Sequence, residues 1–518
     1  MNPDTSFSVA SLLLRTVERH PGELALVAGE GRLTYADLGA RVTALADAWF
    51  AAGVRSGDRV VIYSHTTELA VLAYFASQLL GAVAVPINFR LAPGEVEYIV
   101  RDAGARVLVF GARLAANVER LPAPLLQRLL LVSETAACGA TALETLIASG
   151  GTAVRWQLPQ AQDLAALVYT SGTTGRPKGV MHTHANDVAI ATNVVMEYSL
   201  VPTDRALHIC PLYHVGGMQA YFLPHLAVGA ANVLHESYAA EATLAAIEAE
   251  RISTLFAVPT QIVEMLHHPR FAGFDLRSLR MITTGGAAIA EATMERVVRE
   301  FCPQIFNGYG MTEASLTLLL HPRHALERLG SVGKPTLISR CRLVRDVNAD
   351  PLEDTAADEV GQLIVQGPQV TRGYWNLPEE SARRLKNGWL HTGDLFRRDA
   401  DGFFHFCGRA DDMIVSGGEN IYPREVEEVL HRCAGVKEAA VVGLPDPKWG
   451  AVVTAFVVRS DAALTAEAID RFFKTSGLIA AFKRPKRVVF VEALPTNPSG
   501  KVLKRELIAR YGQQEQAA

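Results

Sequence analysis

Strand-like and helix-like patterns alternate from about residue 36 to residue 283 of this 518-residue chain. The segment 36–52 has helical periodicity and ends before Gly53, and the run DRVVIY at 58–63 is typical of a buried strand. Such alternation predicts a mostly parallel sheet covered by helices. The expected strands are 58–63, 82–87, 106–110, 164–169, 206–210, 230–235, 253–257 and 280–283, and helices are expected at 36–52, 69–80 and 93–103, among others.

The pattern changes twice in the second half of the chain. From about residue 330 to residue 410, Gly, Pro, Asn and Asp separate short expected strands at 341–345, 361–366 and 403–407, which indicates a small β-rich unit. Beyond it, helices are expected at 423–432, 464–475 and 502–510, and strands at 437–443, 451–458 and 487–491. We therefore predict an α/β N-terminal domain at 1–410, built of parallel-sheet subdomains plus the β-rich unit, and a smaller α+β C-terminal domain at 411–518.

The composition disfavours several classes of protein. The formal net charge is −4 and the pI is about 6.4, whereas a dedicated nucleic-acid binder is usually basic. Six cysteines stand far apart without metal-site spacing, and no basic leader precedes an apolar run at the N-terminus, so a cytoplasmic location is expected. The uncharged stretch 69–87 contains Gly81 and Pro86, which predicts a buried helix and strand instead of a membrane span.

A dense run of hydrogen-bond donors, YTSGTTGRPKG at 169–179, follows the apolar stretch 164–168. Its glycines let backbone N–H groups approach an anion closely, its hydroxyl side chains add donors, and Lys178 adds positive charge. Lys178 is followed by Gly179, so the run is not the G-x-x-x-x-G-K-[ST] loop of kinases and GTPases. The run predicts a polyphosphate site of another kind.

This run resembles the signature of the adenylate-forming enzymes, the superfamily of acyl-CoA synthetases, nonribosomal adenylation domains and firefly-type luciferases. Further motifs appear along the chain in that family's order. The resemblance implies activation of a carboxylic acid by ATP and Mg²⁺ as an acyl-adenylate, transfer of the acyl group to coenzyme A, and a mobile C-terminal domain that rotates between the steps. It implies ATP contacts at Thr170, Ser171, Gly172, Thr173, Thr174, Gly175 and Lys178.

The motif NGYGMTE at 307–313 extends the resemblance. It implies that Tyr309 stacks on adenine, Thr312 contacts the α-phosphate and Glu313 holds Mg²⁺. In WLHTGD at 389–394, Asp394 would bind the ribose hydroxyls, and Arg409 would join it there. TGGAA at 284–288 would pass beside the adenine, so the implied nucleotide contacts also include Gly286, Ala287, Asn307, Gly308, Gly310 and Met311.

The C-terminal segment PTNPSGK at 495–501 resembles the family's catalytic-lysine motif. The resemblance implies that Lys501 stabilises charge developing at the α-phosphate, and it places the hinge of the domain rotation at Asp411. A second face would contact coenzyme A in the rotated state. Its implied residues are Gly418 in SGGEN at 416–420, Trp449, and Arg484 and Lys486 in FKRPKR at 482–487, a combination similar to aryl-CoA ligases such as 4-chlorobenzoate-CoA ligase.

The segment PLYHVGGM at 211–218 resembles the lining of the family's acyl pocket, where His214 would lie near the carboxylate. No Lys, Arg, Asp or Glu lies within 212–218 to pair a second carboxylate or an ammonium group. An unpaired buried charge is costly, so the expected substrate is a small apolar acid, either aromatic or medium-chain aliphatic. The glycines of this segment and of the adenine motif, Gly216, Gly217, Gly308 and Gly310, are interpreted as leaving room in the pocket.

Two other functions stay open at this point. An adenylating enzyme could load a carrier protein instead of coenzyme A, although no carrier domain follows Lys501 in this sequence. A catalytically inactive nucleotide-binding homologue is disfavoured by the joint presence of Lys178, Glu313, Asp394 and Lys501. No nucleic-acid partner and no integral membrane association are expected, and a homodimer stays open.

Overall fold

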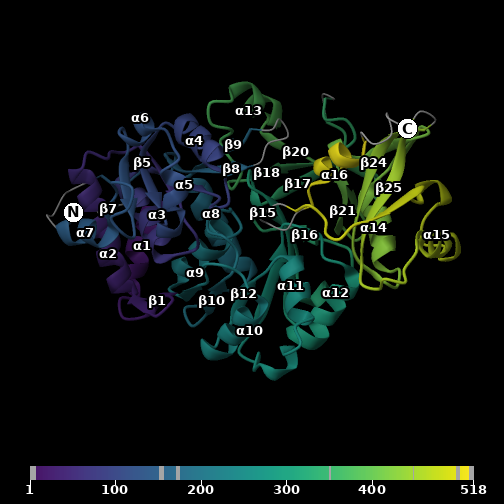
Figure 1. Cartoon of the computed structure of the whole chain (residues 1–518), viewed down its shortest axis with the longest axis horizontal. Helices are drawn as coiled ribbons and strands as arrows, with labels where there is room; N and C mark the ends of the chain where they lie inside the picture. The colour runs from purple at the N-terminus through teal and green to yellow at the C-terminus, as the bar shows by residue number, and fades with distance from the viewer. Residues whose placement is uncertain are drawn as a thin grey trace.

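The computed structural model describes residues 7–150, 157–170, 176–348, 352–446, 449–496 and 502–512. Two large sheets form most of the molecule, and the C-terminal domain lies at the opposite end from the N-terminus (Figure 1). The residues implied at Ser171, Gly172, Thr173, Thr174, Gly175 and Lys501 lie outside the described residues.

The first large sheet has seven strands in the order β7-β6-β5-β3-β4-β8-β9. All neighbours are parallel except β8 and β9. Alternate residues of its strands face opposite layers, so that one face packs on α2 and α3 and the other on α4. The strands are β3 (Arg59–Tyr63), β4 (Val83–Ile87), β5 (Ala105–Phe110), β6 (Leu130–Ser133), β7 (Thr141–Ala142), β8 (Leu164–Thr170) and β9 (Lys178–Thr183). The helices of this region are α1 (Val9–Arg19), α2 (Tyr35–Ala51), α3 (Glu68–Leu80), α4 (Pro93–Asp102), α5 (Ala115–Val118), α6 (Ala123–Leu126), α7 (Leu143–Ser149) and α8 (His184–Glu197).

The second large sheet has nine strands in the order β16-β15-β14-β13-β12-β10-β11-β1-β2. Its six central strands are parallel, and antiparallel pairs close both edges. The strands are β1 (Leu24–Ala28), β2 (Gly31–Thr34), β10 (Arg205–His208), β11 (Ala231–Leu234), β12 (Thr254–Phe256), β13 (Met281–Gly285), β14 (Ile305–Met311), β15 (Ser315–Leu320) and β16 (Lys334–Pro335). The accompanying helices are α9 (Leu223–Val228), α10 (Ala240–Ala249), α11 (Pro259–Leu266) and α12 (Glu291–Arg296).

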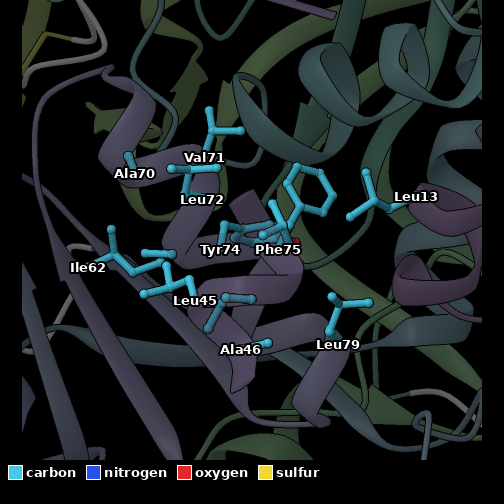
Figure 2. Packing of buried hydrophobic residues seen from close by; sticks show 14 of the residues in the cluster. Leu13, Leu45, Ala46, Ile62, Ala70, Val71, Leu72, Tyr74, Phe75 and Leu79 are labelled. Carbon is cyan, nitrogen blue, oxygen red and sulfur yellow. The ribbon is translucent and has the colours of Figure 1, made fainter. Parts of the chain in front are cut away.

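Helix α3 lies in the middle of the largest apolar core, which Figure 2 shows around Tyr74 and Phe75. Every residue from Leu69 to Leu80 is buried, and β4 begins two residues after the left-handed Gly81. The uncharged stretch 69–87 is therefore a buried helix and strand, as predicted. In the described part of the chain, no helix combines the length and apolarity that a membrane crossing requires.

The β-rich unit is a five-stranded antiparallel sheet of β17 (Arg340–Val344), β18 (Val360–Gln366), β19 (Leu385–Lys386), β20 (Trp389–Arg398) and β21 (Phe404–Arg409), with α13 (Pro378–Arg384) beside it. Beyond β21, the chain continues through a short turn at Ala410–Asp412 into the C-terminal domain. That domain contains β22 (Ile414–Ser416), β23 (Glu419–Ile421), β24 (Val436–Asp446), β25 (Gly450–Arg459) and β26 (Arg487–Phe490), with α14 (Pro423–His431), α15 (Ala466–Thr475) and α16 (Lys504–Gly512).

The predicted fold class is confirmed, since parallel sheets, a β-rich unit and a smaller α+β part follow one another as expected. Several of the strands were not predicted, among them β1 and β20. The N-terminal β1 pairs with β11, with Leu26 opposite Asn232, and β20 contains the whole WLHTGD motif. Both depend on partners distant in the sequence, which local periodicity does not reveal.

Candidate active site

Two of the predicted motifs meet at the carboxyl ends of neighbouring parallel strands. In the pair β13–β14, Thr284 lies opposite Asn307 and Gly285 lies opposite Gly308. A Cβ atom on Gly285 would lie 2.7 Å from the carbonyl oxygen of Gly308, so glycine allows this close approach. Because open α/β sheets bind ligands outside the carboxyl ends of their strands, this edge is the candidate nucleotide site.

Tyr309, Asp394 and Arg409 form a polar cluster at this edge. The Tyr309 hydroxyl donates to Asp394 Oδ2 at 2.5 Å, and Arg409 Nε lies 3.3 Å from Asp394 Oδ1. Arg409 is the cross-strand partner of Asp394 on β21. Burial and the adjacent Asp394 carboxylate raise the pKa of Tyr309 well above its usual value, so the hydroxyl stays a donor. Both oxygens of the implied ribose-binding carboxylate are thus held in place.

The Tyr309 ring has its own supports. It meets Phe396 edge-on, with centroids 4.9 Å apart, and stacks with Phe406 at 6.4 Å. The other implied adenine contacts lie on β13 and β14 or directly after β13. Gly286 has a left-handed backbone with φ of +79°, and the buried amide of Asn307 donates to the Ser331 carbonyl at 3.1 Å. The Asn307 side chain therefore has a structural contact to the segment at Ser331.

Glu313 is held at the end of the turn that follows β14. Its Oε1 accepts a hydrogen bond from the Tyr374 hydroxyl at 2.7 Å, and its backbone carbonyl accepts from Thr371 N at 2.7 Å. Thr312 and Glu313 are only 8% and 9% exposed. Among the described residues, no group of three or more His, Cys, Asp or Glu could hold a metal. A single carboxylate is enough for a Mg²⁺ ion that takes most of its ligands from nucleotide phosphates and water.

Lys178 and Thr170 face each other across the base of the phosphate hairpin, as paired residues of β9 and β8. The Lys178 Nζ atom lies 2.9 Å from Glu380 Oε1 of α13, and both side chains are largely buried. Burial would raise the Glu380 pKa, but hydrogen bonds from Arg383 and Lys178 hold that pKa below its usual value. In this structure the implied phosphate-binding lysine is therefore neutralised by a carboxylate.

Tyr374 is a site residue that the sequence did not predict. The segment 371–375 lies along β9, where Met181 N donates to the Gly373 carbonyl and Tyr374 forms a bridge with Val180. This places the Tyr374 ring beneath Lys178, with Nζ 5.9 Å from its centroid, while its hydroxyl binds Glu313. The only signal in the sequence that could have indicated it is the pair of adjacent aromatic residues in RGYW at 372–375.

His214 lies in a tight turn after β10. Its Nδ1 accepts a hydrogen bond from Gly216 N at 3.2 Å, and burial lowers the pKa of His214, so the ring is neutral. The interpretation of the glycines as pocket space is wrong for two of them. A Cβ on Gly217 would lie 2.2 Å from the Pro211 carbonyl oxygen, and one on Gly310 would lie 2.3 Å from that of Ser315. These glycines permit close backbone contacts.

The implied coenzyme A residues lie on the C-terminal domain. Trp449 is 42% exposed and packs on Gly417, whose hypothetical Cβ would lie 2.8 Å from the indole ring, while Gly418 beside it is exposed. Arg484 pairs with Asp470 at 3.0 Å. Lys486 is exposed, as is Asp411 in the turn after β21. These residues do not belong to the Tyr309 cluster.

A cavity of about 290 Å³ lies away from all these motifs. Its lining includes four glutamates, Glu68, Glu134, Glu144 and Glu236. Arg41 pairs with Glu68 and Glu144, and Arg113 pairs with Glu236. None of the implied site residues lines this cavity, so it is not assigned to the site.

Comparisons with known proteins show the family to which the chain belongs. A family model described as AMP-binding enzyme matches residues 13–375, and one described as AMP-binding enzyme C-terminal domain matches residues 425–501. Feruloyl-CoA synthase from an Amycolatopsis species is 38% identical over 96% of this chain and 98% of its own. Indoleacetate–CoA ligase from Aromatoleum aromaticum is 36% identical over 96% of this chain and 99% of its own.

Two solved structures are similar to this chain over nearly its whole length. The anthranilate CoA ligase AuaEII in complex with anthranoyl-AMP has a TM-score of 0.91 and 27% identity, over 99% of this chain and 98% of its own. The O-succinylbenzoate coenzyme A synthetase from Bacillus subtilis, in complex with ATP and magnesium ion, has a TM-score of 0.84 and 29% identity, over 96% and 98% of the two chains.

Proposed function

Because the chain belongs to the AMP-binding enzyme family and is an AMP-forming acid–thiol ligase, we propose that it converts an aromatic carboxylic acid to its coenzyme A thioester. The acid carboxylate attacks the α-phosphorus of ATP, which forms the acyl-adenylate and releases pyrophosphate. The coenzyme A thiolate then attacks the acyl carbon and releases AMP. The cytoplasm, which supplies both ATP and coenzyme A, is the proposed location.

The observation that carries the proposal is the anchored Asp394 of β20, which Tyr309 of β14 contacts. Tyr309 and Arg409 contact its two oxygens, and Glu313 lies four residues beyond Tyr309, in the turn that follows β14. A preset carboxylate beside an aromatic face suits a ribose and its base, because neither group must reorganise when the nucleotide binds. The Glu313 carboxylate in the turn after β14 suits a cation bound to the phosphates.

In the first step, each proposed residue acts on the nucleotide. Thr170 and Lys178 at the hairpin bind the β- and γ-phosphates, Thr312 contacts the α-phosphate and Glu313 holds Mg²⁺. The metal would offset negative charge on the phosphates when bound. Lys501, whose role is implied by the resemblance of its motif, stabilises charge on the α-phosphate as the carboxylate approaches.

In the second step, the C-terminal domain rotates about Asp411 and presents its other face. Gly418 and Trp449 would then border the pantetheine arm, and Arg484 and Lys486 would meet the coenzyme A phosphates. The Arg484 contact requires exchange of its ion pair with Asp470. A homodimer stays a prediction.

The proposed acid is aromatic for two reasons. The segment around His214 carries no full charge, and the Phe256 ring lies 3.2 Å from the point where a Gly216 side chain would begin, so the surface there is apolar. Two of the similar proteins are named for aromatic acids, ferulate and indoleacetate. A medium-chain aliphatic acid is the second candidate, because ligases for fatty acids are also similar to this chain.

A substrate panel tests the proposal. Ferulate, cinnamates, benzoates, indoleacetate and C4–C12 aliphatic acids are each assayed for AMP formation with coenzyme A, and in parallel with a free acyl carrier protein. We expect the largest kcat/KM for an aromatic acid with coenzyme A. A larger kcat/KM for an aliphatic acid, or faster thioester formation on the carrier protein, would contradict it.

A second experiment separates the two steps. Lys501→Ala is expected to slow acid-dependent pyrophosphate release by about a hundredfold or more, because a positioned cation at the developing charge is lost. Thioester formation from supplied acyl-adenylate should be largely spared. Equal loss of both half-reactions would remove Lys501 from its proposed role.

A further inference from the structure

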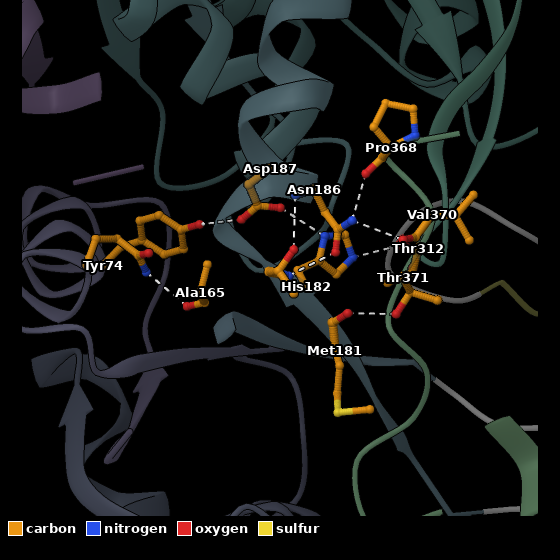
Figure 3. Close-up of polar contacts among 12 residues, drawn as sticks. Tyr74, Ala165, Met181, His182, Asn186, Asp187, Thr312, Pro368, Val370 and Thr371 are labelled. Carbon is orange, nitrogen blue, oxygen red and sulfur yellow. Dashed lines mark hydrogen bonds and ion pairs between the residues drawn. The ribbon is translucent and has the colours of Figure 1, made fainter. Parts of the chain in front are cut away.

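A fully buried ion pair lies directly behind the Thr312–Glu313 turn (Figure 3). His182 of β9 and Asp187 of α8 are both 0% exposed, with His182 Nδ1 2.9 Å from Asp187 Oδ1. The other ring nitrogen, Nε2, lies 2.8 Å from the backbone carbonyl oxygen of Thr312. His182 therefore joins the strand of the phosphate hairpin to the turn that carries Glu313.

The partners of His182 define its protonation state. A carbonyl oxygen and a carboxylate both accept hydrogen bonds, whereas a neutral imidazole has only one N–H to donate. The ring satisfies both partners when both nitrogens carry protons. Burial disfavours the charged ring, but the hydrogen bonds to Asp187 and to the Thr312 carbonyl outweigh it and raise the pKa of His182.

Asp187 is in turn held in place by its own neighbours. It lies in the first turn of α8, where the helix dipole favours negative charge, and the Tyr74 hydroxyl of α3 donates to its Oδ2 at 3.3 Å. The start of α8 is fixed by the Thr183 N-cap, whose side chain accepts from Asn186 N. The helix start and Tyr74 thus hold Asp187 in place, and Asp187 in turn holds the His182 ring.

The same end of α8 also supports Glu313 from the side of Thr371. The Asn186 amide donates to the carbonyls of Pro368 at 2.7 Å and Val370 at 3.0 Å. The next residue, Thr371, donates its N–H to the Glu313 carbonyl and its hydroxyl to the Met181 carbonyl, both at 2.7 Å. One helix end therefore fixes the peptide before Glu313 through His182 and the peptide after it through Asn186.

We propose that the His182–Asp187 pair is a positioning device for the first half-reaction, which sets the Glu313 carboxylate relative to the phosphate hairpin. His182 touches neither substrate nor metal; it acts through the Thr312 carbonyl. The inference rests on the proposed function, because it assumes that Glu313 binds Mg²⁺ with ATP. Residues that orient metal ligands in this way typically change metal affinity or activity by about 10- to 100-fold when mutated.

The test compares His182→Gln with the wild-type enzyme in acid-dependent pyrophosphate release. We expect the Mg²⁺ concentration for half-maximal activity and the KM for ATP to rise about tenfold or more, with the KM for the acid and the rate of thioester formation from supplied acyl-adenylate nearly unchanged. His208→Gln is the matched control, since His208 is also a buried histidine with an amide partner but lies outside this network. It should lower the melting temperature without changing either constant.

Two readouts do not depend on turnover. Mn²⁺ binding in the presence of a non-hydrolysable ATP analogue, followed by electron paramagnetic resonance, should weaken in His182→Gln and in Asp187→Asn. With ¹⁵N-labelled histidine, the signals lost in His182→Gln should show two protonated ring nitrogens at pH ~6.5, where an unperturbed imidazole is only half protonated. If His182→Gln fails to fold, Asp187→Asn and Tyr74→Phe, which removes one hydroxyl, give the same comparison.

The outcomes separate this inference from the proposed function. A wild-type enzyme that releases no pyrophosphate with any acid contradicts the proposed function, while the manganese and nitrogen measurements still judge the ion pair. If the wild type is active, unchanged Mg²⁺ dependence, unchanged Mn²⁺ binding or a neutral His182 ring overturns the inference. The same holds if all constants change in proportion to the loss of melting temperature seen in His208→Gln.

Discussion

Asp394 owes its orientation to side chains from two neighbouring elements. Tyr309 comes from β14 of the nine-stranded sheet, and Arg409 comes from β21 of the β-rich unit. The two residues bind opposite oxygens of the carboxylate, so its plane is fixed before a nucleotide binds. Preorganisation of this kind improves affinity mainly because fewer groups must be ordered when the ligand binds.

Tyr309→Phe tests this arrangement at a single atom. Loss of the hydroxyl removes a hydrogen bond to a charged group, worth about 1.5–3 kcal/mol, while the ring keeps its packing against Phe396. We expect the KM for ATP to rise about tenfold or more, with the KM for the acid unchanged. Tyr35→Phe, which removes another buried hydroxyl that binds the Ala230 carbonyl, is the control. An equal effect of both changes would indicate general loss of stability.

The hairpin β8–β9 and helix α13 are coupled through one ion pair. Glu380 lies within 4 Å of Lys178 and of two arginines of its own helix, Arg383 and Arg384. Any phosphate that recruits Lys178 must compete with this carboxylate. The chain thus keeps the hairpin lysine neutralised until a more highly charged partner arrives.

Glu380→Gln should therefore strengthen ATP binding. Removal of the competing charge leaves Lys178 available and lowers repulsion of the polyphosphate, so we expect the KM for ATP to fall several-fold at low salt and less at high salt. The neighbouring Glu379 is exposed, and Glu379→Gln should leave the KM unchanged. A higher KM in Glu380→Gln would show instead that Glu380 aligns the lysine for the phosphates.

At the scale of the whole molecule, the short turn Ala410–Asp412 connects the β-rich unit to the C-terminal domain. Nearby, Arg432 of the C-terminal domain pairs with Glu291 of α12 at 2.5 Å. Both side chains are partly exposed, and exposed ion pairs contribute about 0–1 kcal/mol. Such a weak tie is compatible with rotation of one domain on the other.

Asp411→Pro is expected to impair thioester formation more than adenylation. Proline fixes φ near −65°, so a turn that must change its dihedral angles would be held in one state. Pyrophosphate exchange and thioester formation are measured side by side, with Asp411→Ala as the control that removes the charge but leaves φ unrestricted. Equal losses in the two half-reactions, or an equal effect of alanine, would contradict the hinge.

Buried neutral histidines should make the fold sensitive to mild acid. Burial lowers the pKa of His208 to about 3 and that of His225 to about 4. Above pH ~6.5 neither folded nor unfolded chain protonates them, and their contribution to stability is complete. As pH falls from ~6.5 toward ~4, only the unfolded chain takes up these protons, so the free energy of unfolding falls by about 1.4 kcal/mol per pH unit for each histidine.

Unfolding by denaturant at pH 7 and pH 5 checks this prediction. The decline between the two values should be smaller in His208→Leu, which cannot take up a proton. The cationic His182 has the opposite sign, since its raised pKa gives stability below pH ~6.5 that is lost as pH rises through the folded pKa. No decline between pH 7 and pH 5 in the wild type would contradict the prediction.

Local patterns in the sequence were enough for much of this molecule. Helical periodicity, apolar runs and Gly or Pro boundaries predicted most of the central strands, because a buried parallel strand is apolar along its whole length. The motifs at 169–179, 307–313 and 389–394 predicted the proposed nucleotide site, because close approach of backbone and ligand restricts the residue types that fit. These features depend on the residues themselves or on their immediate neighbours.

The partners of those motifs depended on the tertiary structure. Tyr309 binds Asp394 across 85 residues, His182 binds the Thr312 carbonyl across 130, and Lys178 binds Glu380 across 202. Each pair exists because strands and helices distant in the chain pack side by side, and no local periodicity encodes that pairing. The sequence by itself therefore determined which residues are candidates to bind a nucleotide, and the fold decided which groups orient, neutralise and support them.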